Sequence, residues 1–170
     1  MKFLDVVERS WPLLGRAMGL HTLAYRATRG VIGHRIPGAF SMLLLDHVGG
    51  KSGERRTSPL LYVPDGDDLV IVASKGGHPK NPAWYHNLRA NPLTTVQVGS
   101  EKREVRARVA NAEERKRLWP KCVEVYGPYA DYQRRADKVD REIPLVILEP
   151  TSERGAVSEA QAARSAARAR

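Results

Sequence analysis

Short β-rich runs joined by turn residues constrain the fold more than any other feature of this sequence. Residues 57–63 and 69–73 are joined by Pro-Asp-Gly-Asp, and residues 93–98 and 101–110 are joined by Gly-Ser, so both pairs are predicted to be hairpins. Residues 42–45 and 143–148 add two further apolar strands. About six strands arranged in this way predict a mainly β, antiparallel small barrel with flanking helices, and they argue against a doubly wound sheet.

Three helical stretches interrupt the strands. Asn81 as the cap and Pro82 as the first helical residue predict a helix that ends near residues 91–92. Residues 112–126 are predicted to be helical, with the single cysteine, Cys122, packed as a buried thiol, and residues 129–139 form a further candidate helix.

The chain is predicted to divide into three parts. Residues 1–37 form an amphipathic helical segment, 38–150 form the barrel domain, and 151–170 form a basic tail rich in Ala, Ser, Arg and Glu that is mostly disordered. Residues 1–35 contain six Lys or Arg and two acids, so the first helix either packs over one end of the sheet or lies on anionic lipid.

The chain is strongly basic, with a net charge of +9 and a pI near 10.0, which implies an anionic partner. That charge alone does not choose among nucleic acid, an anionic membrane surface and a small polyanion. One cysteine excludes an intramolecular disulfide and a cysteine-based metal site. No run is long enough to span a membrane or to form a signal peptide, so the protein is expected in the cytoplasm or on a membrane face; its oligomeric state stays open.

Two basic turns that contain glycine are predicted at strand ends, at residues 49–56 and 74–77. Residues 69–100 contain Lys75, Lys80 and Arg89 but no Asp or Glu, which favours an anion-binding site. Gly-Lys-Ser at 50–52 is not a nucleotide P-loop, because Leu45 stands where that motif requires glycine. No metal site is expected, because the five histidines show no metal-binding spacing.

Lys51 and Arg56 are spaced to meet one anion from two sides, although such a pair is more often a solvated charge cluster. Trp84 and Tyr85 supply flat apolar surface at a helix N-terminus, which favours negative charge. A nucleotide-like redox cofactor, with its phosphate on the cations and its ring near Trp84, fits this combination.

Tyr126, Tyr129 and Tyr132 follow a spacing of three residues around Gly-Pro. On a continuous helix they would share one face, where they either pack in the core or donate a hydrogen bond or a proton to an oxygen that gains charge. The sequence does not decide between these two roles.

Five motifs together resemble one known family. They are Gly-Lys-Ser-Gly-x-x-Arg-x-Ser-Pro-Leu (50–60), Ala-Ser-Lys-Gly-Gly (73–77), Asn-Pro-x-Trp-Tyr-x-Asn-Leu (81–88), Ala-Asn-Pro (90–92) and Tyr-x-x-Tyr-x-x-Tyr (126–132) followed by Ile-Pro-Leu-Val. This order is similar to that of the actinobacterial deazaflavin (F420)-dependent nitroreductases and quinone reductases. The resemblance covers about residues 38–150.

The resemblance implies a split β-barrel of the FMN-binding type and an enzyme that transfers a hydride from reduced F420 to a quinone, such as menaquinone, or to a nitro compound. It implies catalytic roles toward the acceptor for Tyr126, Tyr129, Tyr132 and Ser74. The implied cofactor-binding residues are Gly50, Lys51, Ser52, Arg56, Thr57, Ser58, Pro59, Leu60, Leu61, Val72, Ala73, Ser74, Lys75, Ala83, Trp84, Tyr85, His86, Asn87 and Tyr129. Gly50 departs from the family, which commonly has a basic residue there, and this implies a looser hold on the cofactor's tail unless Arg55 substitutes.

Three alternatives stay open at this point. The same barrel could bind FMN, or the domain could bind nucleic acid through its charge without being an enzyme. Against nucleic acid, the cations gather at glycine turns and not along a helix or stripe with interleaved aromatic residues. The third alternative is a protein that carries the cofactor without turnover.

Overall fold

The computed structural model describes residue 25, residues 35–36 and residues 40–151 of the chain. Its strands are β1 (Arg35–Ile36), β2 (Phe40–Val48), β3 (Arg55–Asp65), β4 (Asp68–Val72), β5 (Leu93–Val98), β6 (Glu101–Val109) and β7 (Leu145–Pro150). Its helices are the short 3-10 helix η1 (Lys75–Gly77), α2 (Ala83–Ala90), α3 (Ala112–Val125) and α4 (Pro128–Asp137). The predicted N-terminal helical segment and C-terminal tail fall almost entirely outside the described residues.

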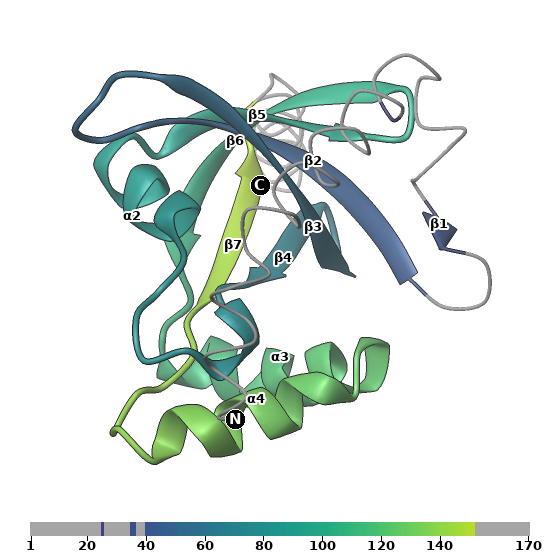
Figure 1. Cartoon of the computed structure of the whole chain (residues 1–170). Coiled ribbons are helices and arrows are strands. Elements are labelled where there is room, and N and C mark those ends of the chain that lie inside the picture. Colours follow the sequence, from purple (N-terminus) through teal and green to yellow (C-terminus); the bar gives the residue numbers. More distant parts are fainter. Residues whose placement is uncertain (1–24, 26–34, 37–39, 152–170) are drawn as a thin grey trace, which may run out of the picture.

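The strands form a closed antiparallel barrel, as the hairpin pattern predicts. The sheet order is β1-β2-β3-β4-β7-β6-β5, and β2 pairs with β5 to close the barrel of six strands. That closing seam joins Leu43, Leu44 and Leu45 to Val98, Gln97 and Val96. The two-residue strand β1 pairs with β2 and was not predicted. Figure 1 shows α3 and α4 together beneath the barrel and α2 at its side.

Tight two-residue turns close both predicted hairpins. Asp65 pairs with Asp68, and Val98 pairs with Glu101, which leaves Gly66 and Gly99 at the turns. Gly66 and Gly99 have φ angles of +64° and +59°, a region that a residue with a Cβ rarely adopts. These glycines therefore explain why the pairing registers of β3 with β4 and of β5 with β6 are fixed.

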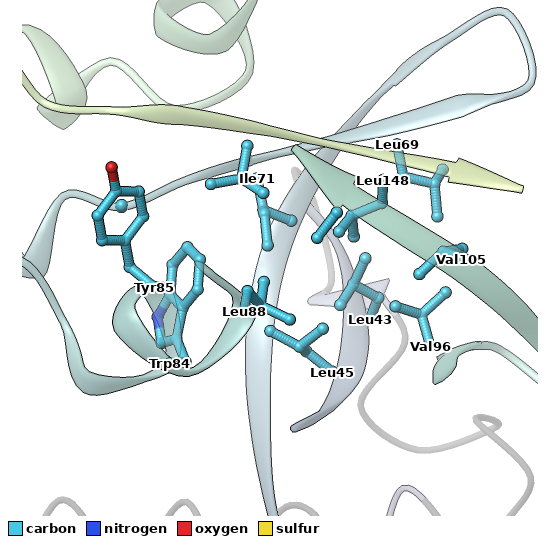
Figure 2. Close-up of a cluster of buried hydrophobic side chains, with 13 residues drawn as sticks. Leu43, Leu45, Leu69, Ile71, Trp84, Tyr85, Leu88, Val96, Val105 and Leu148 are labelled. Carbon is cyan, nitrogen blue, oxygen red and sulfur yellow. The ribbon is translucent and has the colours of Figure 1, made fainter. Parts of the chain in front are cut away.

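The core has two parts that share the same strands. Leu69 and Ile71 point into the barrel with Leu43 and Leu45, whereas Val70 and Val72 point to the cluster between the barrel and helices α3 and α4. Both faces of β4 are therefore buried, which explains its continuous apolar sequence. Figure 2 shows the barrel cluster, with Trp84 and Tyr85 of α2 at one end of it.

Helix α3 is tied to the barrel by charged groups. Asn111 and Glu114 form a reciprocal capping box at its start, and Arg108 of β6 donates to Glu114 at 2.7 Å and to Glu149 at 2.6 Å. Asp65 in the β3–β4 hairpin accepts from Arg117 and Lys121 of α3. As predicted, Cys122 is a buried thiol on this helix, and burial raises its pKa to about 11.

Tyr25 connects the segment before the barrel to the barrel seam. Its side chain is fully buried. Its hydroxyl donates to the carbonyl oxygen of Met42 at 3.0 Å and accepts from the backbone N–H of Gly99 at 2.7 Å. One side chain therefore bridges β2 and the turn after β5. Within the described ranges, no helix is both long enough and apolar enough to cross a membrane.

Candidate functional site

A cleft of about 790 Å³ lies between β3, the η1 loop, α2 and α4. Its walls contain fourteen of the residues proposed from the sequence: Arg56, Thr57, Ser58, Pro59, Leu60, Leu61, Val72, Ser74, Lys75, Ala83, Trp84, Tyr126, Tyr129 and Tyr132. They come from segments spread over more than seventy positions of the chain, and the fold brings them to one place. The cleft is also lined by Met42, His47 and Pro82, which were not proposed.

The η1 loop presents Ser74 and Lys75 to this cleft in an unusual conformation. Lys75, Gly76 and Gly77 have φ angles of +47°, +65° and +78°. The loop is pressed against α4, because a Cβ on Gly77 would stand 2.5 Å from the carbonyl oxygen of Tyr132. Arg135 of α4 also donates to the carbonyl oxygen of Gly76 at 3.2 Å. The second basic turn is thus held by the helix that carries two of the tyrosines.

Arg141 holds the same loop from its other side. Its guanidinium is buried and donates to the carbonyl oxygens of Ala73 at 2.6 Å and His78 at 2.7 Å. It also donates to Asn81 Oδ1 at 2.6 Å. The prediction that Asn81 caps α2 is therefore wrong: Pro82 occupies the cap position without a side-chain bond, and the Asn81 amide binds Arg141.

The three tyrosines converge although the helix between them is broken. Tyr126 is the C-cap residue of α3, and Tyr129 and Tyr132 lie on α4, so two separate helices carry them, as the predicted helices at 112–126 and 129–139 imply. Their ring centroids are nevertheless 5.0 to 6.3 Å apart, and the Tyr126 and Tyr132 hydroxyls are 3.3 Å apart. Burial raises the pKa of Tyr132 to about 12 and raises that of Tyr129 well above its usual value. The hydroxyls of Tyr129 and Tyr132 therefore stay protonated at neutral pH.

His47 lies in the cleft wall at the centre of a hydrogen-bonded chain. Its Nε2 atom is 3.1 Å from Ser58 Oγ, and its Nδ1 atom is 3.0 Å from Asn87 Nδ2. Asn87 Oδ1 accepts from the backbone N–H of Gly50 at 3.1 Å. Burial, together with the charge of Arg56, lowers the pKa of His47, while Asp46 opposes this. The imidazole is therefore neutral at physiological pH.

The first basic turn, residues 49–54, joins β2 to β3 as predicted. Lys51 and Ser52 are exposed there and do not line the cleft. Arg56 does line it, and its guanidinium is paired with Glu54 at 2.6 Å, both side chains being more than half exposed. Of the proposed pair Lys51 and Arg56, the structure thus brings Arg56 into the cleft and leaves Lys51 outside its wall.

The other proposed residues outside the cleft wall have different surroundings. Ala73 and Tyr85 are buried in the barrel core, His86 is exposed, and Asn87 binds Gly50 and His47. Binding of a cofactor by these residues, and by Gly50, Lys51 and Ser52, stays a prediction. His47 continues the inward-facing alternation of Leu43 and Leu45, and this was the signal in the sequence that could have pointed to it.

The cleft is suited to an elongated anion with a flat ring. It offers the cations Arg56 and Lys75, the hydroxyls of Ser58 and Ser74, and the ring of Trp84. No carboxylate is among the described residues that line it. Negative charge in the cleft would therefore meet donors and cations, with Glu54, outside the wall, as the acid that pairs with Arg56.

Comparison with known proteins gives consistent matches. Residues 17–150 match the family model described as F420H(2)-dependent quinone reductase. An F420H(2)-dependent quinone reductase of Mycobacterium tuberculosis (strain ATCC 25618 / H37Rv) is 46% identical over 132 residues, which is 76% of this chain and 87% of that protein.

Two solved structures share the fold. One, described as an F420-H2 dependent reductase (FDR-A), is 43% identical with a TM-score of 0.58 over 64% of this chain and 93% of that chain. The other, described as a domain-swapped dimer, is 39% identical with a TM-score of 0.61 over 80% of this chain and 97% of that chain. The family model begins at residue 17, so the similarity extends beyond the predicted boundary at residue 38.

Proposed function

Because this chain belongs to the F420H(2)-dependent quinone reductase family, we propose that it binds reduced F420 in the described cleft and reduces a quinone of the menaquinone type. The observation that carries the proposal is the cleft itself, in which cations, hydroxyls, an indole ring and three tyrosines face one volume of about 790 Å³. Such a mixture of apolar walls and a few placed polar groups is typical of cofactor sites.

The residues of the cleft fit this cofactor. Its phosphate and acidic tail need cations and hydrogen-bond donors, which Arg56 and Ser58 supply at the start of β3. Its flat ring needs apolar surface, which Trp84, Pro59 and Leu60 supply. Trp84 is only 7% exposed, so its ring is fixed before a ligand arrives.

Reduced F420 supplies the hydride when it is bound, so the protein need only orient the acceptor and stabilise the oxygen that becomes negative. Conversion of a quinone to a quinol also consumes a proton. Tyr129 lines the cleft, is 6% exposed and keeps its proton because burial raises its pKa. We assign it as the hydrogen-bond or proton donor to the quinone oxygen.

Ser74 and the other two tyrosines complete the acceptor end. Of the Tyr126 and Tyr132 hydroxyls, one donates to the other across 3.3 Å, and both residues line the cleft. Arg135 lies over the Tyr132 ring, 5.4 Å from its centroid, and so holds that ring against the η1 loop. A nitro group also presents oxygens that gain charge, so nitro compounds are proposed as secondary acceptors.

Bleaching of reduced F420 absorbance tests the function. The purified full chain is mixed with reduced F420 and a soluble menaquinone analogue, and in separate reactions with a nitroaromatic compound or with the quinone and reduced FMN. We expect catalysed bleaching with F420 and quinone. Turnover with FMN but none with F420 would contradict the assignment. Adding anionic vesicles that contain menaquinone tests whether the predicted N-terminal segment brings the protein to a membrane. A chain that begins at residue 17, and so lacks the first part of that segment, is compared with the full chain, and equal binding would argue against a role for that part.

A further inference from the structure

The hydrogen-bonded chain through His47 crosses three separate elements. It starts in the first basic turn at Gly50, passes through Asn87 of α2 and His47 of β2, and ends at Ser58 of β3. Asn87 and His47 are forty positions apart in sequence. His47 is 5% exposed and Ser58 faces the cleft. This series of hydrogen bonds therefore connects the first basic turn to the Ser58 hydroxyl through the buried imidazole of His47.

The direction of every hydrogen bond in this chain follows from its first member. The backbone N–H of Gly50 can only donate, so the Asn87 atom that it meets must be the oxygen. The Asn87 atom that meets His47 is then the amide nitrogen, which donates to Nδ1. Because Nδ1 must accept, the single proton of the neutral imidazole is on Nε2.

The fixed proton on Nε2 determines what Ser58 can do. Nε2–H donates to Ser58 Oγ across 3.1 Å and occupies one of its lone pairs. The Ser58 hydroxyl hydrogen cannot point back to Nε2, so it is available to an acceptor in the cleft. A hydroxyl whose oxygen already accepts a hydrogen bond is also a stronger donor.

We propose that His47 is a positioning residue that, held in its Nε2–H form by Asn87, directs the Ser58 hydroxyl as a donor to an anionic oxygen of the bound cofactor. This inference rests on the proposed function. The charged groups that face His47 agree with it, since Arg56 lies opposite on β3 and adds a cation to the same end of the cleft. Asp46, on the same strand as His47, is engaged by Thr57 Oγ1 at 2.5 Å.

The tautomer is measured first, on the cofactor-free wild-type protein. Nitrogen-15 NMR of labelled histidine at pH 7.5 distinguishes a protonated from an unprotonated ring nitrogen, and the spectrum of His47→Phe identifies the His47 signals. We expect a single form with Nε2 protonated and Nδ1 unprotonated. A His47 signal with Nδ1 protonated would overturn the proposal, whatever the variants do.

Binding of oxidised F420, followed by quenching of tryptophan fluorescence, is measured next in a double-mutant cycle. We expect Ser58→Ala to weaken binding about tenfold and His47→Phe about threefold, as for loss or misdirection of one hydrogen bond to a charged group. The double variant should bind like Ser58→Ala alone. Equal effects of His47→Phe in the presence and absence of Ser58 would overturn the proposal.

Ser100→Ala is the matched control, because Ser100 is exposed in the β5–β6 turn and outside the cleft wall. It should leave binding unchanged and should not alter the effect of His47→Phe. Failure of the wild type to bind F420 would reject the proposed function, whereas F420 binding with additive variants rejects only the role of His47.

Discussion

Gly77 lies so close to Tyr132 that a Cβ on Gly77 would stand 2.5 Å from the Tyr132 carbonyl oxygen. We expect Gly77→Ala to lower the free energy of unfolding by at least about 2 kcal/mol, because the contact must open and φ is +78°. Urea unfolding measures this. Gly76→Ala is the matched control, since its φ is +65° but nothing lies within 4 Å, and it should cost only about 1 kcal/mol. Equal losses would mean that the contact with α4 is unimportant.

Replacing Arg141 should detach the η1 loop from the segment that precedes β7. Arg141→Met leaves a buried acceptor on Ala73 and half-buried acceptors on His78 and Asn81 without their donor, and we expect a loss of about 3 kcal/mol in unfolding free energy. Arg134→Met, which breaks an exposed pair with Asp131, should change it by less than about 0.5 kcal/mol. Denaturant titration of both variants makes the comparison. A small effect at Arg141 would show that the loop keeps its shape without it.

Tyr129→Phe should slow acceptor reduction by roughly tenfold or more while F420 binding stays nearly unchanged, because one donor is lost from the acceptor end. Steady-state kinetics with a menaquinone analogue gives the rate, and fluorescence quenching gives the affinity. Tyr62→Phe is the control, since Tyr62 packs against the barrel core and does not line the cleft. Unaltered turnover in Tyr129→Phe would reject the catalytic role.

Glu54 competes for a cation that the cofactor is proposed to use. Its carboxylate pairs with Arg56 at 2.6 Å, and both groups are exposed, so the pair is weak. We expect Glu54→Gln to tighten F420 binding roughly twofold to fivefold, the range of an exposed ion pair. Glu101→Gln, which breaks a similar pair with Arg103 at the start of β6, should leave the affinity unchanged. Weaker binding by Glu54→Gln would mean that Glu54 helps to position Arg56.

The lowered pKa of His47 predicts a pH dependence of stability with a definite sign. The folded state holds His47 neutral at pH values where the unfolded chain, with a pKa of about 6.5, already binds a proton. The contribution of His47 is therefore complete above that unfolded value and is lost as the pH falls through the lower folded pKa. Urea unfolding at pH 7.5 and 5.5 should show a larger decrease for the wild type than for His47→Phe. Equal decreases would contradict the shift.

The strands were predictable because their signals are local. The turns at Gly66 and Gly99 and the apolar runs of β4 and β7 each depend on a few adjacent residues, and the structure confirms all four. The N-terminal Tyr25 contact was not predictable, because Gly99 lies 74 positions away from it. Local rules thus locate elements but not the partners that the fold brings to them.

The site residues that stand in short sequence motifs were predictable, whereas those that act through contacts between distant elements were not. Trp84, Lys75 and the tyrosines stand in short motifs, and the structure brings them together in one cleft. His47 and Arg141 carry no motif; Asn87, which binds His47, lies forty positions away from it, and Asn81 and Ala73, which bind Arg141, lie sixty or more positions away. Asn81 shows the limit of local rules, since a residue with good capping chemistry binds a distant guanidinium instead.

The bridge made by Tyr25 has a consequence for how the barrel opens. Only three residue pairs join β2 to β5, whereas seven join β2 to β3, so that junction is the narrowest in the cylinder. The Tyr25 hydroxyl, which comes from a segment outside the barrel, joins β2 to the turn after β5 at the end of this junction. When the Tyr25 side chain is removed, amide hydrogen exchange should therefore be fastest along the β2–β5 junction. A chain shortened past residue 25 would open locally at this junction before it unfolds anywhere else.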